Sequence, residues 1–259
     1  MPLRIDGSPG VAPLVGALAE AYRAKYPGAP VQFASGMGSS ARIKAVQDGQ
    51  IDVAMASHGV DSADLAQRAL TARPIAKTAV VFAVNAGVPI TALTHEQVCG
   101  VYSGRITNWQ ALGAPSAPVR PAFRPPSEVD AEVALQGVPC LAALRFADAV
   151  RVIERPDDMA RVLADSAGTI GVTSEAMVAA SGGRIRSVTL NGVASTPENV
   201  ASGAYPMTRG AILVFRNAPG PAVERFLSFV ASDEGQRVIR ENGAVPTTGG
   251  ALPSIPSGP

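Results

Sequence analysis

Along the first 85 positions, segments with the alternating apolar pattern of a strand are interspersed with segments that have the apolar spacing of a helix. Runs such as Val31–Ser35 and Ile51–Ser57, which alternate or are continuously apolar, are typical of strands. The segment between Pro13 and Pro27 repeats apolar residues every three or four positions, as one face of a helix does. Two further strands are expected at Arg73–Ala76 and Ala79–Asn85. Strands that alternate with helices in this order predict a sheet covered by helices on both faces.

The turn between the second strand and the second helix carries the first chemical signal. Gly36-Met37-Gly38-Ser39-Ser40 follows a strand and precedes a helix expected from Arg42 to Gly49. Two glycines and two serines at such a point leave backbone N–H groups and hydroxyls facing outward. The sequence therefore predicts an anion cradle here, although a serine at this place is also an ordinary helix cap.

The pattern restarts at Gly87, which predicts a second α/β lobe. Thr94 and Gln97 have the spacing of a capping box, which begins a helix. The chain then continues with strands expected at 119–124, 169–173 and 185–190 and helices expected at 127–136 and 157–165. Past Pro197 it returns with a strand at 211–215 and helices at 221–231 and 233–241.

Composition narrows the function classes. The chain has 259 residues, of which 47% are hydrophobic and 17% charged, and a formal net charge of +1, so it is globular and has no basic footprint for nucleic acid. No apolar run approaches the roughly 18 residues of a membrane helix. Met1-Pro2 leads directly into Leu3, so no signal peptide precedes the first strand, as would also be true of a mature exported domain. Cys99 and Cys140 fit a structural disulfide and two buried thiols equally well.

Enzyme signatures are incomplete. Gly36-x-Gly38-x-x-Ala41 fits a dinucleotide fingerprint, but the next strand ends in Ala56-Ser57-His58 without the acidic residue that would hold a ribose. The sequence contains no nucleophile elbow, no P-loop and no HExxH motif. We therefore expect no catalysis, and a nucleotide-dependent oxidoreductase remains a remote alternative.

Eight short motifs occur in the order found in periplasmic phosphate-binding proteins of ABC-type transporters, and the chain resembles that family over nearly its whole length. The motifs are Gly7-Ser8 with Pro13, Gly36-x-Gly38-Ser39-Ser40, Asp52-Val53-Ala54-Met55-Ala56-Ser57, Leu93-Thr94-x-x-Gln97, Tyr102-Ser103-Gly104-x-Ile106-Thr107-Asn108-Trp109, Gly168-Thr169-Ile170-Gly171, Tyr205-Pro206-Met207-Thr208-Arg209, and Glu234-Gly235-Gln236 with Gly243-x-Val245-Pro246.

This resemblance implies an α/β fold of the type II periplasmic binding proteins, in which two lobes joined by two crossing strands close on a ligand. The implied lobes are 1–80 with 208–248 and 84–203, with crossings near Val80–Val84 and Ala204–Thr208 and a mobile tail at 249–259. It also implies a periplasmic monomer that needs no metal or cofactor and delivers a small oxyanion, phosphate above all, to a membrane permease or sensor.

The resemblance also implies a ligand site, which it carries over position by position. The implied ligand-binding positions are Ser8, Pro9, Gly10, Ser39, Ser57, Arg124, Glu128, Val129 and Asp130. The chain departs from the family pattern in three places: Pro9 replaces a threonine, Ser57 replaces the aspartate that accepts the phosphate proton, and Glu128-Val129-Asp130 replaces Ser-Gly-Thr. Ser39 and Arg124 are expected on opposite walls of the cleft.

The acidic departure has a physical meaning of its own. Ser127-x-x-Asp130 is a self-capping arrangement that would occupy the amides of the helix start. Two carboxylates within about 4 Å of a dianion would oppose its binding by several kcal/mol at an effective dielectric constant near 20. Either both carboxylates point away from the ligand, or the ligand is a zwitterionic or cationic solute. Arg124 can contact the ligand, pair with Glu128, or do both.

Overall fold

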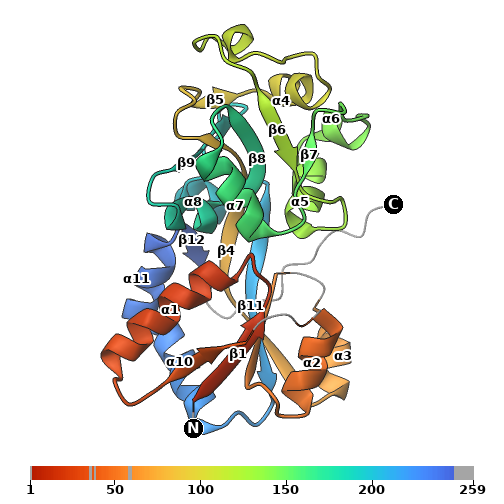
Figure 1. Cartoon of the computed structure of the whole chain (residues 1–259). Coiled ribbons are helices and arrows are strands. Elements are labelled where there is room, and N and C mark those ends of the chain that lie inside the picture. The colour runs from red at the N-terminus through yellow and green to blue at the C-terminus, as the bar shows by residue number, and fades with distance from the viewer. Residues whose placement is uncertain (1, 35–36, 38, 58–59, 248–259) are drawn as a thin grey trace. The chain divides into compact units, whose positions relative to one another are not determined.

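A computed structural model describes residues 2–34, 37, 39–57 and 60–247, with only the backbone described for Ser39 and Ser40 (Figure 1). The chain divides into two compact units, Met1–Lys77 with Gly210–Pro259 (unit 1) and Thr78–Arg209 (unit 2). The chain passes between the units within β4 (Leu70–Asn85) and within β11 (Thr208–Arg216). The predicted tail at 249–259 lies outside the described residues.

Strand β4 corrects one prediction of the sequence. Two strands with a break at Lys77-Thr78 were expected, but β4 is a single strand of 16 residues. Its two ends belong to different units, so the crossing lies at Lys77/Thr78, a few residues before Val80–Val84. The second crossing lies at Arg209/Gly210, just after the expected segment 204–208.

The sheet of unit 1 is mixed. Its strand order is β2 (Val31–Phe33), β1 (Leu3–Gly7), β3 (Val53–Ala56), β11 and β4, and β12 (Ala244–Pro246) also pairs with β4. Strands β2 and β3 run parallel to β1, whereas β11 is antiparallel to β3. The carboxyl ends of β1 and β3 therefore lie at the same edge of the sheet.

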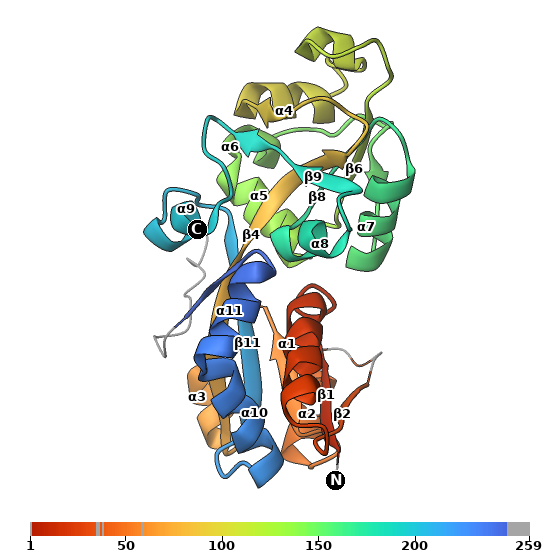
Figure 2. The same cartoon turned by 90° about the vertical axis from the view of Figure 1, so that its left-hand side faces the viewer.

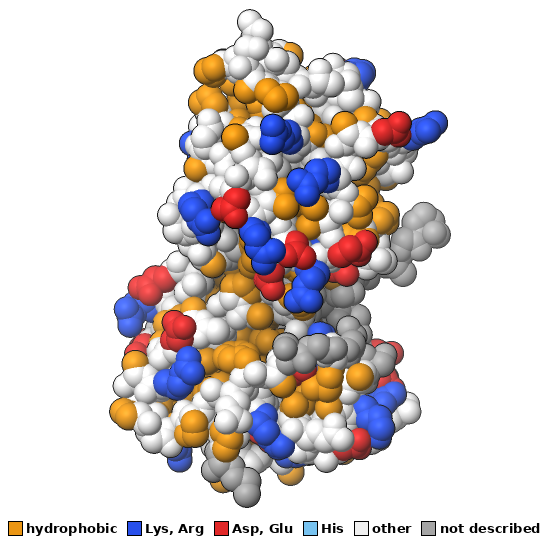
Figure 3. All heavy atoms as spheres, viewed as in Figure 1, with side chains coloured by type: hydrophobic (Ala, Val, Ile, Leu, Met, Phe, Trp, Pro, Cys, Tyr) orange, Lys and Arg blue, Asp and Glu red, His pale blue; other side chains and the backbone are white. Residues whose placement is uncertain are grey.

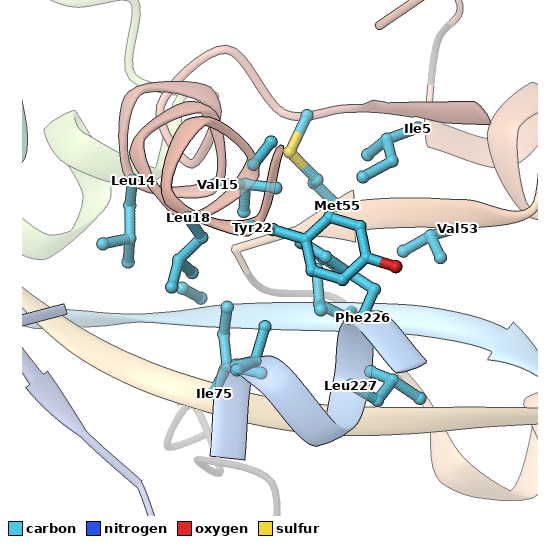
Figure 4. Close-up of a cluster of buried hydrophobic side chains, with 14 of the residues drawn as sticks. Ile5, Leu14, Val15, Leu18, Tyr22, Val53, Met55, Ile75, Phe226 and Leu227 are labelled. Carbon is cyan, nitrogen blue, oxygen red and sulfur yellow. The ribbon is translucent and has the colours of Figure 1, made fainter. Parts of the chain in front are cut away.

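Helices cover both faces of this sheet, as predicted. Alternate residues of the strands enter two separate apolar clusters, as the period of two requires: Val53 and Met55 of β3 belong to one, and Ala54 belongs to the other. The larger cluster packs under α1 (Ala12–Lys25), α10 (Pro221–Ala231) and α11 (Asp233–Glu241) (Figures 2 and 4). The smaller cluster packs under α2 (Ser39–Gln47) and α3 (Ser62–Gln67).

Unit 2 has its own sheet, in the order β4, β8 (Thr169–Ser174), β6 (Arg120–Phe123) and β7 (Arg151–Val152), with β9 (Ile185–Ser187) also paired to β4. The single strand expected at 185–190 is in fact two. Its second part, β10 (Thr189–Leu190), leaves the main sheet and pairs with β5 (Ala92–Leu93). The helices of this unit are α4 (His95–Tyr102), η1 (Trp109–Leu112), α5 (Val129–Gly137), α6 (Pro139–Ala142), α7 (Pro156–Asp165), α8 (Glu175–Ala180) and α9 (Pro197–Ser202).

The capping box predicted in unit 2 is confirmed, and the open alternative for the two cysteines is resolved. Thr94 accepts a hydrogen bond from the Gln97 amide at 3.1 Å, and the Gln97 side chain accepts one from the Thr94 amide at 2.8 Å, which completes the capping box of α4. Trp109 is 1% exposed and donates to the Gly168 carbonyl, so it anchors its loop on the core. Cys99 and Cys140 form a disulfide that joins α4 to α6.

Candidate anion-binding site

In unit 1, the parallel register of β1 and β3 brings two of the predicted site residues together. Gly7 pairs with Met55, so the residues that follow the two strands, Ser8 and Ser57, are neighbours. Their hydroxyl oxygens lie 3.5 Å apart, and the Ser8 amide donates to the Met55 carbonyl at 3.0 Å. A Cβ atom at Gly7 would lie 2.3 Å from the Met55 Cβ, so only glycine permits this close approach. Two neutral hydroxyls thus sit at the carboxyl edge of the sheet.

The loop after β1 is a tight turn that leads into α1. The Ser8 carbonyl accepts hydrogen bonds from the amides of Val11 and Ala12 at 2.9 and 3.1 Å. Gly10 is buried in this turn and Pro9 is exposed. Helix α1 has no side-chain cap at Val11 and no acidic residue in its first turn. No carboxylate therefore neutralises the positive end of the helix dipole here.

Helix α2 begins at Ser39, three residues before the expected start at Arg42. The Ser39 backbone consequently belongs to the first turn, where amide groups have no acceptor within the helix, and that turn contains no acidic residue. The side chains of Ser39 and Ser40 lie outside the described part of the structure, as do Ser35, Gly36, Gly38 and His58. The hydroxyl role predicted for Ser39 therefore stays a prediction.

A buried ion pair lies on the face of β1 that α2 covers. The Asp6 side chain is 1% exposed, and its Oδ1 atom lies 3.4 Å from Nε of Arg42, whose side chain is 13% exposed. Neither Asp6 oxygen accepts a hydrogen bond from any described residue. Asp6 precedes Ser8 by two positions, so this pair lies near the carboxyl end of β1. The sequence analysis missed this pair, although a charged residue inside the run Leu3-Arg4-Ile5-Asp6 was a visible signal.

In unit 2, Arg124 follows strand β6 and is deeply buried. Its side chain is 1% exposed, its Nη1 group donates to the Ile153 carbonyl at 2.7 Å, and its Nη2 group donates to Glu128 Oε2 at 2.9 Å. The Nε group is buried and donates to no described residue. The internal ion pair that the sequence allowed is therefore present, and Arg124 keeps further N–H donors beyond the two bonds.

The predicted self-capping of α5 is wrong. The helix begins at Val129 with Glu128 as its N-cap residue, and no side chain makes a cap hydrogen bond, while Ser127 is exposed. The reason is that both acidic side chains are engaged elsewhere. Glu128 pairs with Arg124, and Asp130, whose side chain is 6% exposed, lies 3.2 Å from Nη1 of Arg209. The first-turn amides of α5, including that of Val129, are left without a side-chain acceptor among the described residues.

The charges of this region balance. Each carboxylate that appeared to oppose an anion, Glu128 and Asp130, has a guanidinium partner. The sequence did not indicate the pairing of Arg209 with Asp130, because the Tyr205-Pro206-Met207-Thr208-Arg209 motif gave no sign of this distant partner. The repulsion expected from two uncompensated carboxylates is correspondingly reduced.

Within the described residues, no group of three or more His, Cys, Asp or Glu side chains could hold a metal ion, and no helix is long and apolar enough to cross a membrane. Positive and negative side chains are interspersed on the face shown in Figure 3, without a basic stripe. The chemistry available at the candidate site is therefore that of hydroxyls, main-chain amides and paired guanidinium groups.

Comparison with known proteins identifies the class. A family model described as a PBP superfamily domain matches residues 2–234, so the chain belongs to this family. The Bacillus subtilis phosphate-binding protein PstS is 24% identical over 255 residues, which are 95% of this chain and 81% of that protein.

Solved structures agree with the α/β fold. One is a candidate phosphate ABC transporter substrate-binding protein from Clostridium perfringens, solved with bound phosphate. It is 25% identical to this chain, with a TM-score of 0.75, and the match covers 96% of this chain and 100% of that one. An ABC-type phosphate transport receptor from Vibrio cholerae, 24% identical with a TM-score of 0.61 over 94% and 99% of the two chains, shares the fold. The resemblance and the fold class inferred from the sequence are thus confirmed.

Proposed function

We propose that this chain is an extracytoplasmic solute-binding protein that captures phosphate and delivers it to an ABC-type permease. The ligand contacts would be the nine predicted positions: Ser8, Pro9, Gly10, Ser39, Ser57, Arg124, Glu128, Val129 and Asp130. The observation that carries the proposal is the set of unused donors in both units. In unit 2 these are the first-turn amides of α5, which no side chain caps, and the buried Nε group of Arg124, and in unit 1 the first turn of α2 contains no acidic residue. Such donors bind an oxyanion without a metal.

The charge pairing of unit 2 supports an anion over a cation. A zwitterionic or cationic solute would need a carboxylate to receive its ammonium group, but Glu128 and Asp130 already have guanidinium partners. Asp130 is also buried, so releasing it from Arg209 would leave an uncompensated charge. The alternative function, a binding protein for a non-phosphate solute, is tested by the experiment below.

Capture would follow the hinge-closing logic of two-lobed binding proteins. A ligand that contacts groups of both units stabilises the conformation in which those groups meet, and its differential affinity shifts the population. The two strands β4 and β11, in which the chain passes between the units, are the natural hinge elements. The Cys99–Cys140 disulfide supports an oxidising, extracytoplasmic compartment.

The test is calorimetry with phosphate, sulfate, molybdate and a panel of amino acids on protein purified without phosphate. Phosphate should bind with a dissociation constant in the micromolar range or below, and amino acids should not bind. Without an acidic proton acceptor at position 57, we also expect sulfate to compete measurably with phosphate. Tight binding of an amino acid with no binding of any oxyanion would overturn the proposal.

Arg124→Ala should weaken phosphate binding by several kcal/mol, because a charge-assisted contact is worth roughly twice a neutral one. Ser57→Ala is the variant to compare with Arg124→Ala, because it removes a neutral hydroxyl and not a charge. Its loss should weaken phosphate binding by about 1 kcal/mol. Equal affinity of the Arg124→Ala variant and the unchanged protein would remove Arg124 from the site.

A further inference from the structure

The Arg124–Glu128 pair joins two side chains with very different environments. The guanidinium is 1% exposed, whereas the carboxylate is 46% exposed. The Ile153 carbonyl fixes the guanidinium from the protein side through Nη1. The Glu128 carboxylate accepts a hydrogen bond from Nη2. This carboxylate is the exposed partner of the pair.

The Glu128 side chain has no other structural task. It does not cap α5, although Glu128 is the N-cap residue. Arg124 is its sole hydrogen-bond partner within the described part of the chain. Its neighbour Asp130 differs, since that carboxylate is 6% exposed and paired with the equally buried Arg209. Glu128 can therefore leave Arg124 for water at little cost, and Asp130 cannot leave Arg209.

We propose that Glu128 is an internal competitor for the bound anion. Its carboxylate occupies a guanidinium N–H that an anion oxygen would use, and ligand binding exchanges one acceptor for the other. This inference rests on the proposed function, because it assumes that Arg124 contacts the anion. It refines the place of Glu128 among the nine predicted positions: its carboxylate lies at the site but competes with the anion, so it lowers the affinity instead of providing it.

Two consequences distinguish this role. First, removing the charge of Glu128 should raise anion affinity, because the buried guanidinium is left without its counter-ion until a ligand supplies one. Second, the gain should be larger for a dianion than for a monoanion, since the repulsion from Glu128 scales with the charge of the ligand. A structural role of the carboxylate predicts neither gain.

The experiment measures binding of phosphate, sulfate and the monoanion nitrate by calorimetry at pH 8 to unchanged protein, Glu128→Gln and Glu128→Ala. The matched control is Glu132→Gln, one turn further along α5, where the carboxylate accepts from Gln136 at 3.4 Å. We expect Glu128→Gln and Glu128→Ala to bind phosphate and sulfate about tenfold more tightly, as one freed charge-assisted hydrogen bond would give. Glu132→Gln should change affinity less than twofold.

Urea unfolding of each variant without ligand keeps the result interpretable. If Glu128→Ala fails to fold, Glu128→Gln retains the shape of the side chain and decides the question. Unchanged or weaker phosphate binding by folded Glu128→Gln overturns the inference and leaves the proposed function standing. If neither the unchanged protein nor either variant binds an oxyanion, the proposed function fails, and this inference fails with it.

Discussion

The two units offer donors to an anion in different ways. In unit 1 the candidate contacts are neutral: the adjacent hydroxyls of Ser8 and Ser57 and the first turns of α1 and α2, neither of which has an acidic residue. In unit 2 the candidate contacts are charged, and each charge is already paired, Arg124 with Glu128 and Asp130 with Arg209. Hydroxyls and main-chain amides contact an anion without a net charge, whereas a paired guanidinium must first exchange its partner.

This contrast shows where affinity and selectivity can be adjusted. Main-chain amides are held by the sheet and its helices, so side-chain substitutions change them little without disturbing the fold. The ion pairs of unit 2 involve side chains alone, so one substitution such as Glu128→Gln alters the electrostatics and leaves the backbone in place. The candidate contacts of unit 1 are therefore fixed by the backbone, and those of unit 2 can be adjusted by substitution of side chains.

The units also differ in how they are stabilised. Unit 1 has two apolar clusters on the two faces of its sheet, and its buried charges, Asp6 and Arg42, lie between β1 and α2. Unit 2 contains a disulfide. Both units contain a group of aromatic rings, which includes Tyr22, Phe226 and Phe229 in unit 1 and Tyr102, Phe123 and Phe146 in unit 2. Burial raises the pKa of Tyr102, whose hydroxyl donates to the Ala122 carbonyl, so the ring stays neutral in the core.

The largest expected effect tests the buried charge of unit 1. Arg42→Met removes the ion partner of a carboxylate that is 1% exposed, and breaking a buried pair in this way costs about 3–5 kcal/mol. The measurement is the free energy of unfolding in urea. A double variant, Asp6→Leu with Arg42→Met, should recover most of the loss, because it leaves no charge in the interior.

Lys44→Met on the same helix is the control for this prediction. Lys44 pairs with Asp48 in solvent, where the two side chains are 71% and 38% exposed, so its loss should cost less than about 0.5 kcal/mol. Equal destabilisation by Arg42→Met and Lys44→Met would show that the Asp6 carboxylate does not depend on its partner.

The second effect concerns unit 2 alone. Replacing Cys99 and Cys140 together by serine opens a link that spans 41 positions, which should cost about 3–4 kcal/mol by the chain-entropy estimate. Hydrogen exchange followed by mass spectrometry should report weaker protection of amides in unit 2, with unit 1 unchanged. A uniform loss across both units would mean that they unfold as one cooperative body.

The smallest effect is a pH dependence in unit 1. Burial raises the pKa of Asp52, but hydrogen bonds from the Arg4 side chain and amide outweigh it and hold that pKa below its ordinary value. A lowered pKa in the folded state adds stability above the unfolded pKa, and this stability is lost as the pH falls through the folded value.

Asp52→Asn should therefore destabilise the protein by about 1 kcal/mol at pH 7, a modest figure because solvent screens a pair in which Arg4 is 41% exposed. The difference from the unchanged protein should begin to shrink as the pH falls below about 4, near the unfolded pKa of a carboxyl group, and should vanish only below the lower pKa of the folded state. Urea unfolding at a series of pH values measures it. A difference that grows toward acid pH would contradict the assignment.

The amino-acid sequence by itself determined the local structure and the family. The spacing of apolar residues fixed α10 at Pro221–Ala231 and α11 at Asp233–Glu241, and Thr94 with Gln97 fixed the start of α4. These features are encoded within a few positions, since a helix face or a capping box needs no distant partner. The motif order was likewise sufficient to indicate the family before any coordinates.

The tertiary structure decided the features that depend on distant partners. Strand β4 continues through Lys77-Thr78, where the sequence indicated a break, because its ladder partners come from elsewhere in the chain. In the sequence, the acidic residues at the start of α5 resemble helix caps. In the structure, Asp130 instead pairs with Arg209, which is distant in the sequence. A buried charge pairs with an opposite charge that the fold places within contact distance, and the local spacing of residues does not indicate which distant residue that is.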